Sequence, residues 1–151
     1  MTTLHNILST YDSAQHATAH GTQMHARLQR VVIDGDNTRG DMDLVSQVRA
    51  NSALLPFFGP NSMTEVPIAG TINNRFVSRR IDRLVIDDVN KTIRILDYKT
   101  DTDRIVYHDK YMIQLREYAV LLRAIYPGHK ITAHILWTHD FSLENVPVKS
   151  L

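Results

Sequence analysis

The chain has 151 residues, a length that suits one domain with its own hydrophobic core. It has no cysteine, which excludes disulfides, thiolate zinc sites and cysteine-held iron–sulfur clusters, so any metal must be held by His, Asp, Glu or backbone oxygens. Such ligands suit Mg²⁺ or Mn²⁺, and the formal net charge of +1 argues against a strongly basic, free-standing nucleic-acid binder.

The start of the chain is polar and has weak periodicity. We expect residues 1–20 to be poorly ordered or to lead into a helix, and residues 21–151 to form a single domain. The first residues lack a basic start followed by an apolar stretch, and no apolar run reaches the length of a membrane span. The sequence therefore predicts a cytoplasmic protein with no membrane segment.

Two helices are expected in the first third of the chain. One begins near Gly21–Thr22, with Thr22 as a candidate cap, and has an apolar side made by Leu28, Val31 and Val32. Residues 35–41 have the composition of a loop, and a second helix is expected over residues 41–50.

Strands dominate the middle of the chain. Alternating apolar residues predict strands over 64–72, 75–87 and 92–100, with a turn at 88–91. A helix is expected over 108–125 and the last strand over 130–138. The apolar stripe of that helix consists of Tyr111, Leu115, Tyr118, Leu122 and Ile125. This order indicates a mixed α/β layer structure.

Two aspartates meet if the central hairpin is paired through Asp87 and Thr92. Asp82 then lies opposite Asp97, and Lys99 continues the same face. Opposed residues have Cβ atoms about 4.5–5.5 Å apart, so two carboxylates there repel each other unless a divalent cation lies between them. Spacing alone leaves a second interpretation open, because a slip of one residue in register separates the acids and acids at strand ends commonly face water.

Four arginines fall within nine residues of the second expected strand: Arg75, Arg79, Arg80 and Arg83. They either contact phosphates or form a solvated strand face, and composition does not choose between these interpretations. Trp137 in the last expected strand also has two interpretations: it packs in the core, or it stacks on a base.

Motifs in order along the chain resemble the RecB/AddA group of the PD-(D/E)XK nuclease superfamily. The stretches are RRIDRLVIDD, DYKTD and QLREYAVLL. The resemblance implies a restriction-endonuclease-like mixed central sheet flanked by helices, with an active site at Asp82, Asp97 and Lys99. It also places Gln114 and Tyr118 beside the site, although Tyr118 equally fits core packing.

Upstream motifs extend the resemblance. GTQMHARLQ is similar to the family's helix with a metal-binding histidine, which implies His25 as a ligand. TEVP resembles the strand whose glutamate lies near the site, which implies Glu65, and the backbone carbonyl of Tyr98 completes the implied ligand set. One departure is Arg79, where the family usually has glycine; its side chain either crowds the substrate groove or adds a phosphate contact.

The resemblance implies an Mg²⁺- or Mn²⁺-dependent DNA exonuclease that leaves a 3′-hydroxyl and a 5′-phosphate. The absence of cysteine favours the AddA-like branch, in which the nuclease domain adjoins a helicase active in repair of double-strand breaks by recombination. No G-x-x-x-x-G-K-[ST] loop is present, so the chain fits a domain of a longer protein, a split-off subunit or a stand-alone relative.

The expected partners are DNA, a helicase polypeptide and a second nuclease or helicase subunit. Two alternatives remain open at this point. One is a non-catalytic module with a nuclease fold that binds DNA or a partner, and the other is a stand-alone, structure-specific endonuclease.

Overall fold

The computed structural model describes residues 20–149, which contain one five-stranded sheet. Its strands follow the order of the chain: β1 (Met63–Ile72), β2 (Arg75–Asp87), β3 (Thr92–Lys99), β4 (Lys130–Trp137) and β5 (Ser142–Val146). The β3–β4 pair is parallel and the other three pairs are antiparallel. The mixed sheet expected from the sequence is thus present.

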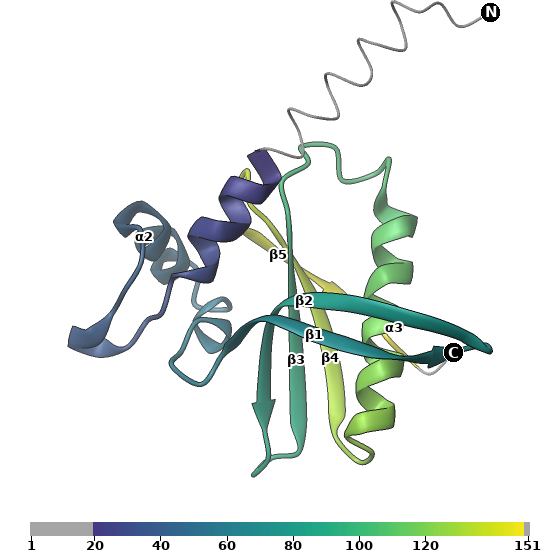
Figure 1. Ribbon diagram of the computed structural model, residues 1–151. Coiled ribbons are helices and arrows are strands. Elements are labelled where there is room, and N and C mark those ends of the chain that lie inside the picture. Colours follow the sequence, from purple (N-terminus) through teal and green to yellow (C-terminus); the bar gives the residue numbers. More distant parts are fainter. Residues whose placement is uncertain (1–19, 150–151) are drawn as a thin grey trace, which may run out of the picture.

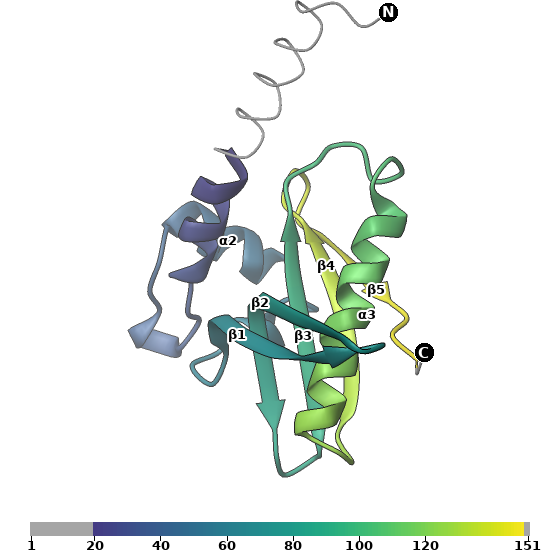
Figure 2. The ribbon, with the colours of Figure 1, turned by 45° about the vertical axis from the view of Figure 1, so that its right-hand side comes forward.

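Helices cover both faces of this sheet (Figures 1 and 2). On one face lies α3 (His108–Ile125), the connection between the parallel strands β3 and β4. The other face is covered by a helical segment at residues 20–29, α2 (Met42–Ala50) and the short η2 (Leu55–Phe57), with η1 (Gly35–Asn37) at the periphery. Each face has its own apolar core, because strand side chains point alternately to the two sides.

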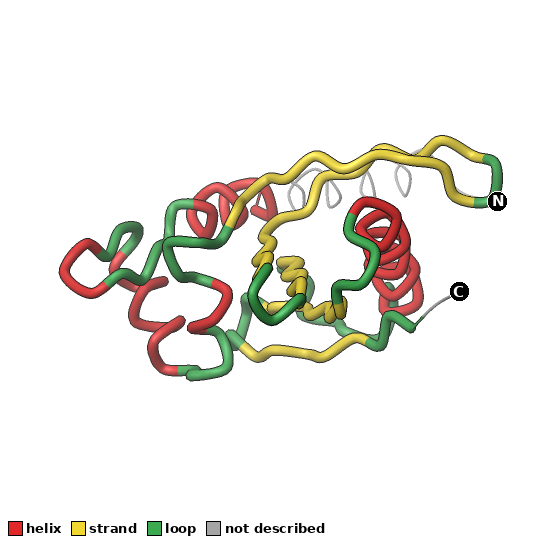
Figure 3. Tube along the Cα trace, turned by 90° about the horizontal axis from the view of Figure 1, so that it is seen from below, coloured by secondary structure: helices red, strands yellow, loops and turns green. Residues whose placement is uncertain are grey.

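Strand β2 takes part in both the sheet and a two-stranded arm. Its residues 83–87 pair with β3, whereas residues 75–81 pair only with β1. This second part of the β1–β2 hairpin is the arm, and it extends alongside α3 (Figure 3). Ile81 and Leu84 both pack in the core on the α3 side, although strict alternation puts residues three apart on opposite faces. The strand therefore twists at Asp82 and Arg83.

The partner strand is also irregular at this point. Glu65 interrupts the β1–β2 ladder between the pairs Thr64–Arg83 and Val66–Ile81, at the level of Asp82. Its φ of 52° is in the left-handed region, which costs a non-glycine residue about 1–2 kcal/mol. The two strands are thus distorted together at the position of the first predicted acid.

Several boundaries differ from the expectations. The strand over 130–138 is not the last one, because β5 follows it; its sequence SLENV is short and mostly polar and has no clear alternation. The first helix already includes His20, so Thr22 lies within it and the prediction of Thr22 as its cap is wrong; the helix ends before Val31 and Val32.

Ile125 does not belong to the buried stripe of α3, since it is 53% exposed. Residues 1–19 of the expected N-terminal segment lie outside the described residues. Among the described helices, none has the length and apolar character needed to cross a membrane.

Candidate active site

Asp82 and Asp97 lie where β2 and β3 separate. The hairpin pairs Asp87 with Thr92, which confirms the expected register, and the last paired residues are Arg83 and Leu96. The two aspartates come one step beyond that pair, and both are buried. Because the strands diverge there, Asp82 accepts a hydrogen bond from the backbone N–H of Tyr98 at 2.8 Å instead of continuing the ladder.

Burial and proximity act strongly on one of these acids. The pKa of Asp82 is raised from 3.8 to about 8, first because burial penalises the charged carboxylate and second because Asp97 carries a negative charge beside it. Hydrogen bonding from the Tyr98 N–H and the charge of Lys99 oppose this increase. The site therefore holds an excess of negative charge that favours binding of either a proton or a cation.

His25, 73 residues before Tyr98 in the sequence, places an imidazole nitrogen beside Asp82. Its Nε2 lies 3.1 Å from the carbonyl oxygen of Tyr98 and 3.7 Å from Oδ2 of Asp82. The helical segment at residues 20–29 therefore directs this imidazole at β2 and β3. Three potential ligands converge here: an imidazole nitrogen, a carboxylate oxygen and a backbone carbonyl oxygen.

The donor set fits a hard divalent cation in its chemistry, since oxygen ligands with one imidazole suit Mg²⁺ or Mn²⁺. Oδ2 of Asp97 is buried and receives no hydrogen bond of regular geometry from the described residues, and the charge beside it is the ammonium of Lys99 at 2.8 Å. Within residues 20–149, however, no three His, Asp or Glu side chains are clustered as metal ligands. The carboxyl of Asp97 lies beside that of Asp82 and forms an ion pair with Lys99.

Lys99 is fixed by a chain of polar contacts. Its Nζ lies 2.8 Å from Oδ2 of Asp97 in an ion pair and donates a hydrogen bond to Oε1 of Gln114 at 3.0 Å. Nε2 of Gln114 then donates to the hydroxyl of Tyr118 at 2.7 Å, which donates to the carbonyl oxygen of Arg80 at 3.2 Å. Gln114 and Tyr118, four residues apart on α3, thus link the lysine to β2.

Tyr118 both packs in the core and lies beside the site, the two interpretations that the sequence left open. Its ring is 2% exposed and packs in the core under α3, while its hydroxyl belongs to the polar chain. Burial raises the pKa of Tyr118, and the charges of Asp97 and Asp82 raise it further. The hydroxyl therefore stays protonated and able to donate.

Two predicted neighbours of the site have other partners. The Glu65 carboxylate lies 3.8 Å from Nη1 of Arg80, an ion pair at the edge of the site. Arg79 is held against α3, since its Nε donates to Oε2 of Glu117 at 3.2 Å. The arginine in the place of glycine therefore contacts the helix and leaves the predicted ligands uncovered.

Trp137 packs in the core and does not offer a stacking surface. It is fully buried, and its indole N–H donates to Glu144 at 3.2 Å.

Tyr111 was expected only as a core residue of α3. Its ring also makes a cation–π contact with the ammonium of Lys99, which lies 4.2 Å from the ring centroid. No feature of the sequence pairs these two residues.

Arg83 was missed as a supporting residue. It is completely buried, its guanidinium lies 4.2 Å from the centre of the Phe58 ring, and its Nε donates to the Tyr98 hydroxyl at 2.8 Å. Further hydrogen bonds go to Ser62 Oγ and to the carbonyl oxygens of Leu28, Gln29, Val31 and Phe57. The clue in the sequence is an arginine between Ile81 and Val85 on what alternation makes an apolar face.

Comparison with known families adds one finding. The family model described as the PD-(D/E)XK nuclease superfamily matches residues 64–142, just over half of the chain. The match includes Asp82, Asp97 and Lys99 and most of the sheet. No curated protein matched the chain. With its mixed sheet between two helical layers, the chain has the restriction-endonuclease-like α/β fold and belongs to the PD-(D/E)XK nuclease superfamily.

Proposed function

We propose that this protein is a divalent-metal-dependent deoxyribonuclease that hydrolyses phosphodiester bonds. The observation that carries the proposal is the convergence of His25, Asp82 and the Tyr98 carbonyl oxygen, with Asp97 and Lys99 beside them. Asp82, Asp97, His25 and the Tyr98 carbonyl oxygen are the residues that would hold one or two Mg²⁺ or Mn²⁺ ions. When bound, such an ion lowers the pKa of a water and polarises the phosphate.

Lys99 has two tasks in this proposal. Its ammonium orients the attacking water and offsets negative charge that develops on the phosphate. The water oxygen bonds to phosphorus, the bond from phosphorus to the 3′ oxygen breaks, and that oxygen takes up a proton, leaving a 3′-hydroxyl and a 5′-phosphate. Gln114 and Tyr118 hold the ammonium in place through the polar chain on α3.

Glu65 is proposed as an accessory acid. It lies at the level of Asp82 on the neighbouring strand, where the ladder is interrupted, and its carboxylate is partly exposed, with 29% of the side-chain surface accessible. From this position it adds negative charge at the rim of the site. It is a candidate for contacts to a second ion or to waters around it.

An AddA-like context is proposed from sequence features. The motifs IDRL, DYKT and QLREY follow the order of that group, and the chain has no cysteine for an iron–sulfur cluster. We infer that this nuclease acts as an exonuclease in double-strand break repair, with a helicase polypeptide and a second nuclease or helicase subunit as partners. Residues 21–151 form its single nuclease domain, and the cytoplasm is the proposed location.

Degradation of linear single-stranded DNA by the purified protein tests the proposal. We expect hydrolysis with Mg²⁺ or Mn²⁺, none with EDTA, and loss of activity in Asp82→Asn. Asp36→Asn serves as the matched control, because Asp36 is exposed in η1, away from the site. Full activity in Asp82→Asn would rule out the site, and opening of closed circular DNA would indicate an endonuclease rather than an end-dependent enzyme.

A further inference from the structure

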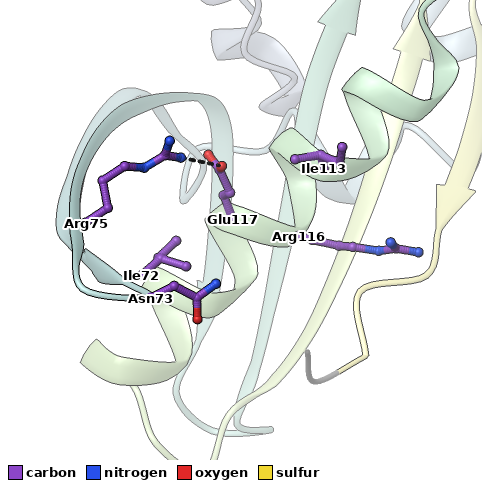
Figure 4. Close-up of a pocket in the computed structure, with 6 residues that line it drawn as sticks. All are labelled: Ile72, Asn73, Arg75, Ile113, Arg116 and Glu117. Carbon is purple, nitrogen blue, oxygen red and sulfur yellow. Dashed lines mark ion pairs between the residues drawn. The ribbon is translucent and has the colours of Figure 1, made fainter.

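A groove runs along α3 between the helix and the β1–β2 hairpin. Its outer part, shown in Figure 4, has a volume of about 400 Å³ and is lined by Ile72, Asn73, Arg75, Ile113, Arg116 and Glu117. Its inner part has a volume of about 450 Å³ and is lined by Arg79, Lys99, Lys110, Tyr111, Ile113, Gln114 and Glu117. Because Ile113 and Glu117 line both parts, the groove is continuous from Lys99 to the turn of the hairpin.

Positive charge is concentrated along this groove. Arg75 and Arg79 project from β2, Lys110 from α3 and Lys99 from β3, whereas Glu117 is the single acid among the lining residues. This excess contrasts with the net charge of +1 for the whole chain. A local excess of cations in a cleft attracts a polyanion even when the overall charge is small.

Glu117 forms ion pairs with both arginines but does not occupy all of their N–H donors. Its carboxylate lies 3.1 Å from Nη2 of Arg79 and 3.9 Å from Nη2 of Arg75, and Figure 4 shows the pair with Arg75. Each guanidinium has five N–H donors. In Arg79, Nε donates to Glu117 and Nη1 to the carbonyl oxygen of Ser78 at 3.0 Å, so both arginines keep N–H groups for phosphate oxygens. The side chain of Arg75 is 75% exposed and that of Arg79 is 39% exposed, so both are accessible from solvent.

We propose that this groove binds the backbone of a single DNA strand that leads to the active site. The inference rests on the proposed nuclease function. Arg79 and Lys110 contact the phosphate next to the one at Lys99, and Arg75 contacts the phosphate beyond it. Each part of the groove has the volume of a small-molecule site, about 300–1,000 Å³, which suits nucleotides taken one after another instead of a duplex.

Apolar surface in the groove supports a single strand. Ile113 is 57% exposed in the wall shared by both parts, and the ring of Tyr111 lines the inner part. Unpaired bases offer apolar faces that such side chains contact, whereas the bases of a duplex are stacked inside it. The groove thus provides both of the contacts that single-strand binders use, cations for the backbone and apolar side chains for the bases.

Binding of a fluorescein-labelled oligothymidylate, measured by anisotropy in EDTA, tests this inference without any need for hydrolysis. We expect Arg79→Gln and Lys110→Gln to weaken binding about 5- to 10-fold each at low salt, as for loss of one charge-assisted contact. The slope of log affinity against log salt should fall by about 0.7 for each phosphate contact removed. Arg30→Gln is the matched control, because Arg30 is exposed next to the residue 20–29 helix, away from the groove.

The outcomes separate this inference from the nuclease proposal. Unchanged affinity in both groove variants, or no binding by the wild-type protein, overturns the groove assignment while leaving the hydrolysis test unaffected. Tighter binding of a duplex of the same sequence, weakened by the same substitutions, overturns the single-strand assignment. Lys110 is exposed, so Lys110→Gln keeps the test valid if loss of the Arg79–Glu117 ion pair unfolds the protein.

Discussion

Nη2 of Arg83 donates a hydrogen bond to the carbonyl oxygen of Leu28 across 2.8 Å. This bond joins β2 to the end of the helical segment that carries His25, and a second bond at 3.1 Å from the same nitrogen reaches the carbonyl oxygen of Val31. Carbonyl groups at the end of a helix lack their regular partners, and the Leu28 carbonyl oxygen accepts from the N–H of Val31 at 3.1 Å as well as from the guanidinium. Arg83 therefore positions His25 over Tyr98 while lying on the far side of the sheet from α3.

Replacement of this arginine should destabilise the fold. Arg83→Met keeps part of the buried volume but leaves carbonyl oxygens and the Tyr98 hydroxyl without a donor, so we expect a loss of about 3–5 kcal/mol in the free energy of unfolding. Urea denaturation measures it, with the exposed Arg30→Met as control. Arg83→Lys should recover only part of the loss, because an ammonium cannot reach as many acceptors. A loss below about 1 kcal/mol in Arg83→Met would contradict this role.

The polar chain on α3 predicts a graded effect on hydrolysis. Lys99→Met should lower kcat by about 100- to 1,000-fold, as expected when a donor to developing charge is removed. Gln114→Met should lower kcat by about 10-fold, because Gln114 is proposed to act on the reaction through the ammonium that it holds. Steady-state hydrolysis of single-stranded DNA measures both. A greater loss from Gln114→Met than from Lys99→Met would reverse the proposed roles.

The raised pKa of Asp82 predicts a pH-dependent stability of the metal-free protein. Between the ordinary value of 3.8 and the folded value of about 8, the folded state holds a proton that the unfolded state releases. The free energy of unfolding therefore falls as pH rises through this window and levels off above it. Asp82→Asn removes the titrating group and keeps a similar shape.

Thermal unfolding in EDTA from pH 5 to pH 9 measures this effect. The difference in Tm between wild type and Asp82→Asn removes the contribution of the other titrating groups. The Tm of the wild type should fall relative to that of Asp82→Asn as the pH rises. A difference that stays constant over the range would mean that Asp82 is not protonated in the folded protein near neutral pH.

The β2–β3 hairpin and its acids could be predicted because they depend on local geometry. Once residues 88–91 form the turn, alternation along the strands brings Asp82 and Asp97 together and puts Lys99 on the same face. The helix on which Gln114 lies follows from apolar spacing over a long segment, the most reliable of the periodic signals.

Other features depend on contacts that spacing does not encode. His25 meets the Tyr98 carbonyl oxygen from 73 residues away, and only the resemblance to a family suggested it. The position of Arg79 against Glu117 depends on how the hairpin arm lies along α3. Strand β5 was missed because a short polar segment at the edge of a sheet gains its pairing from β4 and has little pattern of its own.

The backbone of Glu65 predicts a gain in stability from a substitution. Glu65→Gly places a residue that tolerates positive φ where φ is 52°, so we expect the free energy of unfolding to rise by up to about 1 kcal/mol. The same change removes the carboxylate and should lower the rate of DNA hydrolysis. Glu65→Gln, which keeps the backbone conformation and loses only the charge, is the control for activity.

Substitutions at position 65 that raise thermal stability should therefore lower the rate of DNA hydrolysis. A library of variants screened only for survival at high temperature should become enriched in glycine or asparagine at this position, since both accept the left-handed conformation. A library screened for DNA hydrolysis should retain the acid. Sequencing the two selected pools would show whether the chain retains a strained backbone at this position in order to keep a carboxylate at the edge of the site.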